Sequence, residues 1–312
     1  MNCKRLLILS VLLLSFSAGE CPAADFVKKK CTARIDTVIL RSADATGHSA
    51  AVMYCFVPED PGGVAAIICP GGSYCWLDMK NEGFAVAEWL NEQGISAFVL
   101  HYRTAGFGAW FWHSRYFVRG IRHPDMIADV QRALQWVGGF SEKYGADCDK
   151  IGVIGFSAGG HLAMSAACFS DTPFLEREGL SSNVNVKPAF VASIYPVVTL
   201  REPFVHKRSR RALLGDDRQR NKMMIDSLSL ELHIPDDCPP VFLVNCRDDK
   251  VVDYHNSVML DSALTAAGAR HLYRQYESGG HGFGVSESRG SAESRKWKWE
   301  FIEWLKEIDI VK

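Results

Sequence analysis

The stretch IGVIGFSAGGH, residues 151–161, decides the fold. An apolar run that suits a buried strand ends in the pattern G-x-S-x-G around Ser157, and small residues that suit the start of a helix follow it. This pattern is typical of a nucleophile elbow, a turn from strand to helix so tight that small residues must flank the serine. Because the turn projects the hydroxyl above the strand and the helix N-terminus favours negative charge there, Ser157 is predicted to be a nucleophile. A purely structural glycine turn is the less favoured alternative.

A second glycine-rich turn, PGGSY at residues 70–74, follows the apolar run at residues 64–69. Glycines at this place let backbone amides approach a bound substrate, as an oxyanion hole requires. We expect the amides of Gly72, Ser73 and Ala158, the residue after the nucleophile, to form that hole. Residues 70–74 alone would favour an ordinary Pro-Gly-Gly turn, and the elbow downstream makes that interpretation the weaker one.

A serine nucleophile needs a base and an acid that orients the base, and on such an elbow both follow the serine, the acid before the histidine. Asp248 and Asp249 follow the buried strand expected at residues 241–246, and His281 lies between glycines further on. We expect His281 to take the proton from Ser157 and return it to the leaving group, while the aspartate fixes the imidazole tautomer. The spacing alone leaves Asp248 and Asp249 both open.

Hydrophobic periodicity elsewhere alternates between strand and helix. The expected strands are residues 34–40, 50–57, 64–69, 95–102, 150–155, 190–195, 241–246 and 272–276. The expected helices are residues 82–92, 126–140, a segment after Ser157, 257–267 and 293–306. This alternation predicts an α/β fold with a doubly wound, mostly parallel sheet that begins with antiparallel strands. Two stretches without clear periodicity, residues 104–123 and 196–235, are expected to be lid-like loops at one end of the sheet.

Composition excludes several classes of protein. The chain has 312 residues, 47% hydrophobic and 23% charged, so it can bury a sizeable core. Its 35 Lys and Arg residues against 36 Asp and Glu residues give a formal charge of -1, without the basic field that a nucleic-acid binder needs. The absence of internal repeats and of a flexible linker favours a single domain over residues 25–312.

The N-terminal segment, residues 1–24, has the form of a secretory signal peptide. A basic start precedes an apolar run at residues 6–14 that is too short to span a bilayer. We therefore expect export to the periplasm, the cell surface or the medium. The cleavage site stays open, and Cys21 is a second possibility as a lipid-modified residue, which Glu20 directly before it makes less favoured. No later stretch reaches the roughly 20 apolar residues of a transmembrane helix.

Metal and cofactor sites are not predicted. Beyond the N-terminal segment no cysteines form a C-x-x-C pair, and the scattered histidines lack metal-ligand spacing. His161, one turn after Ser157, is expected to line or pack the site rather than to react. The basic run at residues 206–211 is more consistent with a solvated turn than with a grip on an acidic substrate. Disulfide pairing and oligomeric state stay open.

Several segments taken together resemble the α/β-hydrolase superfamily: PGGSY, EGFAVAEWLNEQGISAFVLHYR, DVQRALQWV, DKIGVIGFSAGGHLA, RDDKVV and GGHGFG. More closely, the chain looks like the bacterial secreted esterases related to acetylxylan and feruloyl esterases, with a further likeness to the catalytic domain of prolyl oligopeptidases. The resemblance implies Ser157 as nucleophile, His281 as base and Asp248, the first aspartate of the pair, as acid.

The resemblance also implies that two pairs of residues, Glu82 with Gly83 and Tyr102 with Arg103, help to shape the site. It implies a serine carboxylic-ester hydrolase without cofactor, a carbohydrate O-acetylesterase that works through an acyl-enzyme on a small-molecule or polysaccharide ester. A feruloyl esterase and a peptidase of the prolyl-oligopeptidase kind are the alternatives within hydrolases. A catalytically inactive binding protein of the same fold is the remote one, because every member of the triad is present.

The substrate side is the least determined. Tyr74 and His161, with Trp110 and Trp112 of the aromatic insert at residues 109–117, are the candidate substrate-binding residues. Aromatic faces stack on sugar and aryl groups, so the insert fits a wall of the binding site. A lid or a dimer contact is an equal alternative for it.

Overall fold

The computed structural model describes residues 34–42, 50–106, 120–179 and 186–312. The chain divides into two units, residues 1–31 and 32–312, and every described residue lies in the second. The expected signal peptide, residues 1–24, therefore lies outside the described residues, as do Trp110 and Trp112.

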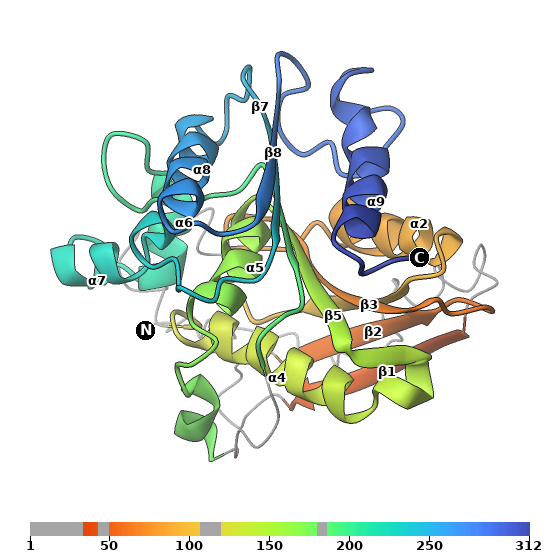
Figure 1. Cartoon of the computed structure of the whole chain (residues 1–312). Helices are drawn as coiled ribbons and strands as arrows, with labels where there is room; N and C mark the ends of the chain where they lie inside the picture. The colour runs from red at the N-terminus through yellow and green to blue at the C-terminus, as the bar shows by residue number, and fades with distance from the viewer. Residues whose placement is uncertain (1–33, 43–49, 107–119, 180–185) are drawn as a thin grey trace, which may run out of the picture. The chain divides into compact units, whose positions relative to one another are not determined.

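An eight-stranded sheet organises this second unit, with the strand order β1-β2-β4-β3-β5-β6-β7-β8 (Figure 1). The strands are β1 (Arg34–Arg41), β2 (Ala51–Val57), β3 (Gly63–Cys69), β4 (Ser96–His101), β5 (Ala146–Phe156), β6 (Val191–Ile194), β7 (Val241–Cys246) and β8 (His271–Tyr276). Strand β2 is antiparallel to both of its neighbours, and every other pair is parallel. The prediction of a doubly wound, mostly parallel sheet that begins with antiparallel strands is confirmed.

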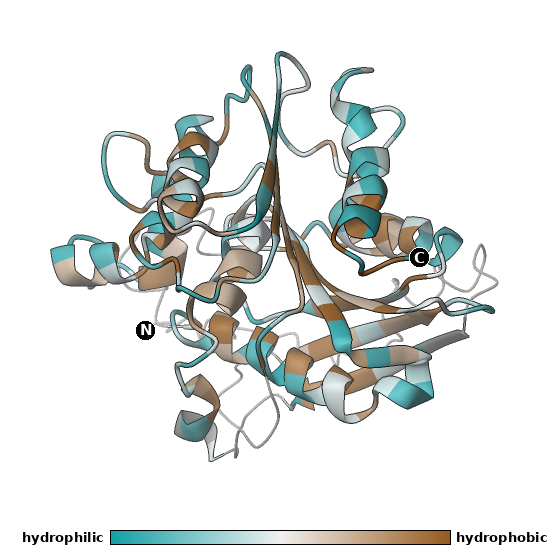
Figure 2. Ribbon diagram, viewed as in Figure 1, coloured by the Kyte–Doolittle hydropathy of each residue, from teal (hydrophilic) through white to brown (hydrophobic). Residues whose placement is uncertain are grey.

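The central strands are buried along nearly their whole length because helices cover both faces of the sheet. Every residue of β7 is buried, as are the last six of β5, so these strands read as continuous apolar runs. Side chains of successive residues still point to opposite faces: Ile67 joins the main core, while Ile68 is equally buried outside that cluster. Figure 2 shows brown, hydrophobic residues along the strands and teal ones on the outer sides of the helices.

Helices pack on the two faces in separate groups, with α2 and α9 on one side and α4, α5 and α8 on the other (Figure 1). The longer helices are α2 (Ala85–Glu92), α4 (Asp125–Gly139), α5 (Ala158–Cys168), α8 (His255–Ala266) and α9 (Trp297–Glu307). Aromatic rings join α2 to α9, where Trp89 lies 5.7 Å from Trp297 between ring centroids, and join α9 to the sheet through Phe242 and Phe301 at 5.4 Å. Within the described ranges, no helix is long and apolar enough to cross a membrane.

The helix expected at residues 82–92 begins earlier than predicted and in a different form. A π-helical turn, η1 (Met79–Phe84), precedes α2, and the Asp78 carboxylate caps it by accepting a hydrogen bond from the Asn81 amide at 3.1 Å. Short π-helical segments occur often at functional sites. Here the turn carries Glu82, whose contacts are described below.

The prediction that residues 196–235 form a loop is wrong. The segment contains α6 (Lys207–Leu214), α7 (Lys222–Ser227) and a 3-10 turn, η4 (Leu230–Leu232). Helices of eight and six residues are too short for a period of 3.6 to be visible in sequence. Helix α7 buries no side chain, and it begins at a cap where Asn221 accepts from the Met224 amide at 3.3 Å. The remaining 3-10 turns are η2 (Ser141–Tyr144), η3 (Phe174–Glu178) and η5 (Ser294–Lys296).

Candidate active site

The nucleophile elbow lies between β5 and α5 and forces Ser157 into a strained backbone conformation, with φ 55° and ψ -118°. The flanking glycines are required by close backbone approaches. A Cβ atom on Gly155 would lie 1.9 Å from the carbonyl oxygen of Gly159, and one on Gly159 would lie 2.0 Å from the carbonyl oxygen of Cys69. Each spacing is impossible for a side chain, so the G-x-S-x-G pattern follows from the geometry of the turn.

Ser157, His281 and Asp249 form a continuous hydrogen-bonded row. His281 Nε2 lies 2.8 Å from Ser157 Oγ, and its Nδ1 lies 2.6 Å from Asp249 Oδ2. All three follow the carboxyl ends of parallel strands, β5, β8 and β7 respectively, which meet at one edge of the sheet. The arrangement lets the imidazole accept the serine proton at one nitrogen while the carboxylate holds the proton at the other.

The prediction that Asp248 orients the histidine is wrong. Asp248 is exposed, and its carboxylate accepts hydrogen bonds from the amides of Gly279 and Gly280 at 3.2 and 2.8 Å. Asp249 turns inward because its own amide bonds to the Cys246 carbonyl at 3.3 Å, which closes a tight turn after β7. The turn directs two adjacent carboxylates to different partners: Asp248 holds the backbone of the loop that carries His281, and Asp249 holds its ring.

The loop at residues 70–74, called the glycine loop below, lies directly beside the nucleophile. A Cβ atom on Gly71 would lie 2.9 Å from the Cβ atom of Ser157. Among the described residues, none accepts a hydrogen bond from the amides of Gly72, Ser73 or Ala158. The Ala158 amide belongs to the first turn of α5, where amides have no partner within the helix. These three amides are thus available to a negatively charged oxygen.

Glycine is required at position 72 by the same kind of constraint. Gly72 has φ 140°, and a Cβ atom there would lie 1.9 Å from the Trp76 carbonyl oxygen. Its own carbonyl accepts from the amides of Cys75 and Trp76 at 2.9 and 3.1 Å, so the chain curls sharply after the glycine pair. Ser73 itself has φ 58°, an uncommon value for a residue with a side chain.

Tyr74 and His161 do not line the site as predicted, because both are fully buried and bonded to each other. The Tyr74 hydroxyl lies 2.8 Å from His161 Nδ1, and His161 Nε2 lies 2.9 Å from the Leu228 carbonyl. Since a carbonyl only accepts, Nε2 carries the proton, and Nδ1 accepts from the tyrosine. Burial lowers the pKa of His161 to about 4, which keeps the imidazole neutral. The pair therefore ties Tyr74, the last residue of the glycine loop, to His161 of helix α5.

The residues that the resemblance implied lie where they can hold the glycine loop. The Tyr102 hydroxyl donates to the Pro70 carbonyl at 2.7 Å. Arg103 pairs with Asp129 of α4, both 2% exposed, at 2.7 Å between Nη2 and Oδ1. Glu82 is also buried, and its Oε2 accepts from the Gly71 amide at 2.7 Å.

Tyr195 is a site residue that the sequence interpretation missed. Its ring centroid lies 4.8 Å from that of His281, and its hydroxyl donates to Glu82 Oε1 at 2.9 Å. The same hydroxyl accepts from the Gly284 amide at 3.0 Å. It lies directly after β6, at the edge of the sheet where the other site residues gather, and that position was the only indication in the sequence that it could belong to the site.

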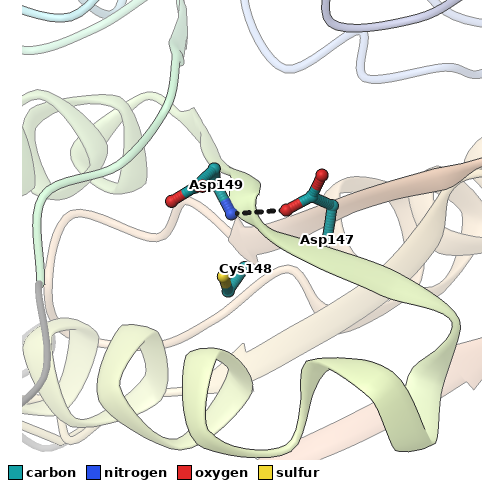
Figure 3. A group of neighbouring side chains, drawn as sticks. All are labelled: Asp147, Cys148 and Asp149. Atoms are coloured by element: carbon teal, nitrogen blue, oxygen red, sulfur yellow. Dashed lines mark hydrogen bonds between the residues drawn. The ribbon is translucent and has the colours of Figure 1, made fainter.

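One further group of potential metal ligands lies away from this site. Asp147, Cys148 and Asp149 at the start of β5 place potential ligand atoms within 4.8 Å of one another (Figure 3). All three are exposed, and the Asp149 amide donates to Asp147 Oδ1 at 3.0 Å, which accounts for part of the clustering. They lie in the first residues of β5, and Ser157 follows the opposite end of that strand, so they take no part in the arrangement around the serine.

Comparison with known proteins gives a consistent picture. A family model described as BD-FAE matches residues 78–264. An acetylxylan esterase from Xylanibacter ruminicola is 30% identical over 239 residues, 75% of this chain and 44% of that protein. An endo-1,4-beta-xylanase B from Butyrivibrio fibrisolvens is 28% identical over 220 residues, 70% of this chain and 32% of that protein. The chain thus spans less than half the length of either relative.

Among solved structures, the acetyl ester-xyloside bifunctional hydrolase from Caldicellulosiruptor lactoaceticus is similar, with a TM-score of 0.77 and 28% identity. The match covers 89% of this chain and 97% of that one. The two chains therefore share the same overall fold.

Proposed function

Because the chain belongs to the BD-FAE family, we propose that it is a serine carboxylic-ester hydrolase of the α/β-hydrolase fold that removes acetyl groups from a carbohydrate. The observation that carries the proposal is the row from Ser157 through His281 to Asp249, with distances of 2.8 and 2.6 Å. A hydroxyl so placed is activated as a nucleophile by the adjacent imidazole.

The proposed reaction proceeds in two halves. Ser157 Oγ attacks the ester carbonyl carbon while its proton passes to His281 Nε2, and the carbonyl oxygen becomes an oxyanion. The amides of Gly72, Ser73 and Ala158 are the proposed donors to that oxyanion. Collapse of the tetrahedral intermediate breaks the bond to the sugar oxygen, which takes the proton from His281 and leaves an acetyl-serine. Water then repeats the sequence and releases acetate.

Asp249 is the proposed orienting acid. Its second oxygen, Oδ1, accepts from the amides of Val251 and Val252 at 2.7 and 3.0 Å. These bonds fix the carboxylate so that Oδ2 faces Nδ1 of His281. The negative charge then stabilises the imidazolium that forms in each half of the reaction.

The substrate class rests on two relatives. One is named an acetylxylan esterase, and the solved structure with 28% identity is described as acting on acetyl esters and xylosides. An exported enzyme meets such polysaccharides outside the cell, which agrees with the proposed signal peptide at residues 1–24. Substrate contacts from Trp110 and Trp112 belong to the same proposal and stay predictions.

The test is a matched panel of acetylated xylan, feruloylated arabinoxylan and a proline-containing peptide, given to the wild type and to Ser157→Ala. We expect acetate release by the wild type and a loss of about 1,000-fold or more in the variant. Peptide cleavage, or ferulate release without acetate, would overturn the substrate class. Acetate release that survives Ser157→Ala would overturn the mechanism.

A further inference from the structure

We infer that Glu82 is a positioning residue for this reaction: its buried carboxylate ties the glycine loop to the loop that carries His281, and its charge stabilises the imidazolium. The inference rests on the proposed function. It concerns a residue that touches neither the nucleophile nor the ring of His281 through any hydrogen bond described above.

Both oxygens of Glu82 accept hydrogen bonds, which favours the ionised form of the carboxylate. The Gly71 amide can only donate, and it lies 2.7 Å from Oε2. The Tyr195 hydroxyl already accepts from the Gly284 amide at 3.0 Å, so its own proton points to Glu82 Oε1 at 2.9 Å. These hydrogen bonds favour an ionised Glu82, although the side chain is only 3% exposed.

The network joins two loops that the reaction needs at a fixed distance. Through Gly71, Glu82 holds the turn whose next two amides are the proposed oxyanion donors. Through Tyr195 it holds Gly284, three residues after His281. A Cβ atom on Gly284 would lie 2.8 Å from the Asn81 carbonyl oxygen, so the loop that carries His281 also packs directly on η1. A shift of Glu82 would therefore move the oxyanion donors and the base together.

Glu82 is also expected to act through its charge. The pKa of Glu82 is raised above its ordinary value, first of all by burial, while the hydrogen bond from Tyr195 and the positive charge of His281 oppose that rise. Asp78 raises it further, and Arg289 lies 3.5 Å from that Asp78 carboxylate. Because coupling between two charges is reciprocal, an ionised Glu82 stabilises the imidazolium by the amount that His281 stabilises the carboxylate.

The other titratable groups that face His281 set the background for any pH measurement. Asp249 bonds to its ring, and Tyr195 packs on it. His206 at the start of α6 has a pKa lowered to about 4, by burial first and then by the charges of His281 and Arg208. His206 is therefore neutral above about pH 5, and removal of Glu82 changes the field at His281 without a compensating change there.

The test is Glu82→Gln, which keeps the side-chain size and one acceptor oxygen but removes the charge. We expect kcat to fall by about 10- to 100-fold, with KM within about twofold of the wild type. Because the imidazolium loses a stabilising charge, the acidic limb of the kcat/KM profile moves to lower pH. The matched control is Glu88→Gln, the same substitution at a half-buried glutamate of the following helix α2, which leaves kcat within about twofold.

The outcomes separate this inference from the proposed function. A Glu82→Gln enzyme with wild-type kcat and an unmoved acidic limb, beside an inactive Ser157→Ala, overturns the inference alone. A fall in kcat without a moved limb means that Glu82 only holds the fold, and it also overturns the inference. If Glu82→Gln does not fold, Tyr195→Phe takes its place: it keeps the charge and cuts the link to Gly284, and an unchanged kcat would refute the coupling. Activity in Ser157→Ala would instead remove the proposed function itself.

Discussion

The carboxylate of Asp249 connects the imidazole of His281 to the backbone after β7. The carboxylate of the neighbouring Asp248 makes neither of these two contacts. We expect Asp249→Asn to lower kcat by about four orders of magnitude, since an amide in that place favours the wrong imidazole tautomer. Asp248→Asn loses only charge-assisted bonds to Gly279 and Gly280, so kcat should fall by less than about tenfold. Steady-state hydrolysis of p-nitrophenyl acetate measures both variants, and a larger loss in Asp248→Asn would contradict the geometry.

This pair also shows where sequence reasoning stops at single residues. Ser157 and His281 could be located because each lies in a glycine pattern whose shape is dictated by its neighbours. The two aspartates carry the same chemistry one residue apart, and they are distinguished only by backbone hydrogen bonds after β7: the Asp249 amide bonds to Cys246, and the amides of Val251 and Val252 bond to the Asp249 carboxylate. Tyr195 was missed because a tyrosine after a buried strand has no distinguishing pattern around it.

Position 159 has no room for a side chain, so a glycine is required there for steric reasons. A methyl group there would meet the Cys69 and Pro70 carbonyl oxygens at 2.0 and 2.6 Å, so Gly159→Ala should lower the free energy of unfolding by about 3 kcal/mol or more. Gly139, at the end of α4, has open space around the same position. Gly139→Ala should leave stability unchanged or raise it by up to about 1 kcal/mol. Urea denaturation measures the free energy of unfolding of both variants. Equal changes in Gly159→Ala and Gly139→Ala would contradict the prediction, because they would mean that the elbow can widen to accept a methyl group.

At the scale of elements, the buried pair between Arg103 and Asp129 anchors the end of β4 on α4. The Asp129 carboxylate also accepts from the Arg103 backbone amide at 2.8 Å, so it fixes both the side chain and the chain direction. Asp129→Ala leaves a buried guanidinium without this partner and should lower the free energy of unfolding by about 3–5 kcal/mol.

The control for that prediction is an exposed ion pair between Arg122, before α4, and Asp217, after α6. Arg122 and Asp217 are 41% and 62% exposed, so Asp217→Ala should cost less than about 1 kcal/mol. Urea titrations of both variants decide the matter. A cost for Asp129→Ala that does not exceed the cost for Asp217→Ala would mean that the buried pair holds nothing together.

Helix α5 makes stability depend on pH through His161. Its pKa of about 4 in the folded chain lies below the ordinary value of 6.5, so between these values the unfolded chain binds one more proton. The free energy of unfolding therefore falls as pH drops through this window, by about 3 kcal/mol in all from this group. Urea titrations from pH 7 to 4 should show a shallower fall in His161→Gln, while Tyr74→Phe, which keeps the imidazole, retains the slope. An identical slope in His161→Gln would contradict a neutral buried imidazole.

Some helices could be predicted from the sequence and others could not. Helices α2, α4, α5, α8 and α9 pack a broad apolar face on the sheet or lie against a motif, so their positions could be predicted closely. Helices α6 and α7 could not, because α6 buries mainly the residues of its last turn and α7 buries none. Helix α7 has a cap at Asn221, and both helices pack on neighbours distant in sequence, which hydrophobic periodicity does not record.

For the whole molecule, the alternation of strands and helices was enough to predict the architecture, because a parallel sheet covered on both faces is the arrangement that buries such elements. The site follows from the architecture: residues after β3, β5, β6, β7 and β8 meet at one edge regardless of their separation in sequence. Specificity does not follow from it. The aromatic insert at residues 109–117, which holds the candidate substrate-binding residues Trp110 and Trp112, lies outside the described residues.

Export is a property of the whole chain, and it decides whether the proposed esterase reaches a polysaccharide outside the cell. We expect the chain, expressed with its own N-terminus in a Gram-negative host, to lose its signal peptide by cleavage within or directly after residues 1–24 and to appear outside the cytoplasm. Intact-mass spectrometry of fractionated cells measures this. A mass that retains Cys21 with added acyl chains, lost in Cys21→Ser, would replace cleavage by a lipid anchor. A full-length chain in the cytoplasm would contradict export, and it would leave an esterase without access to extracellular xylan.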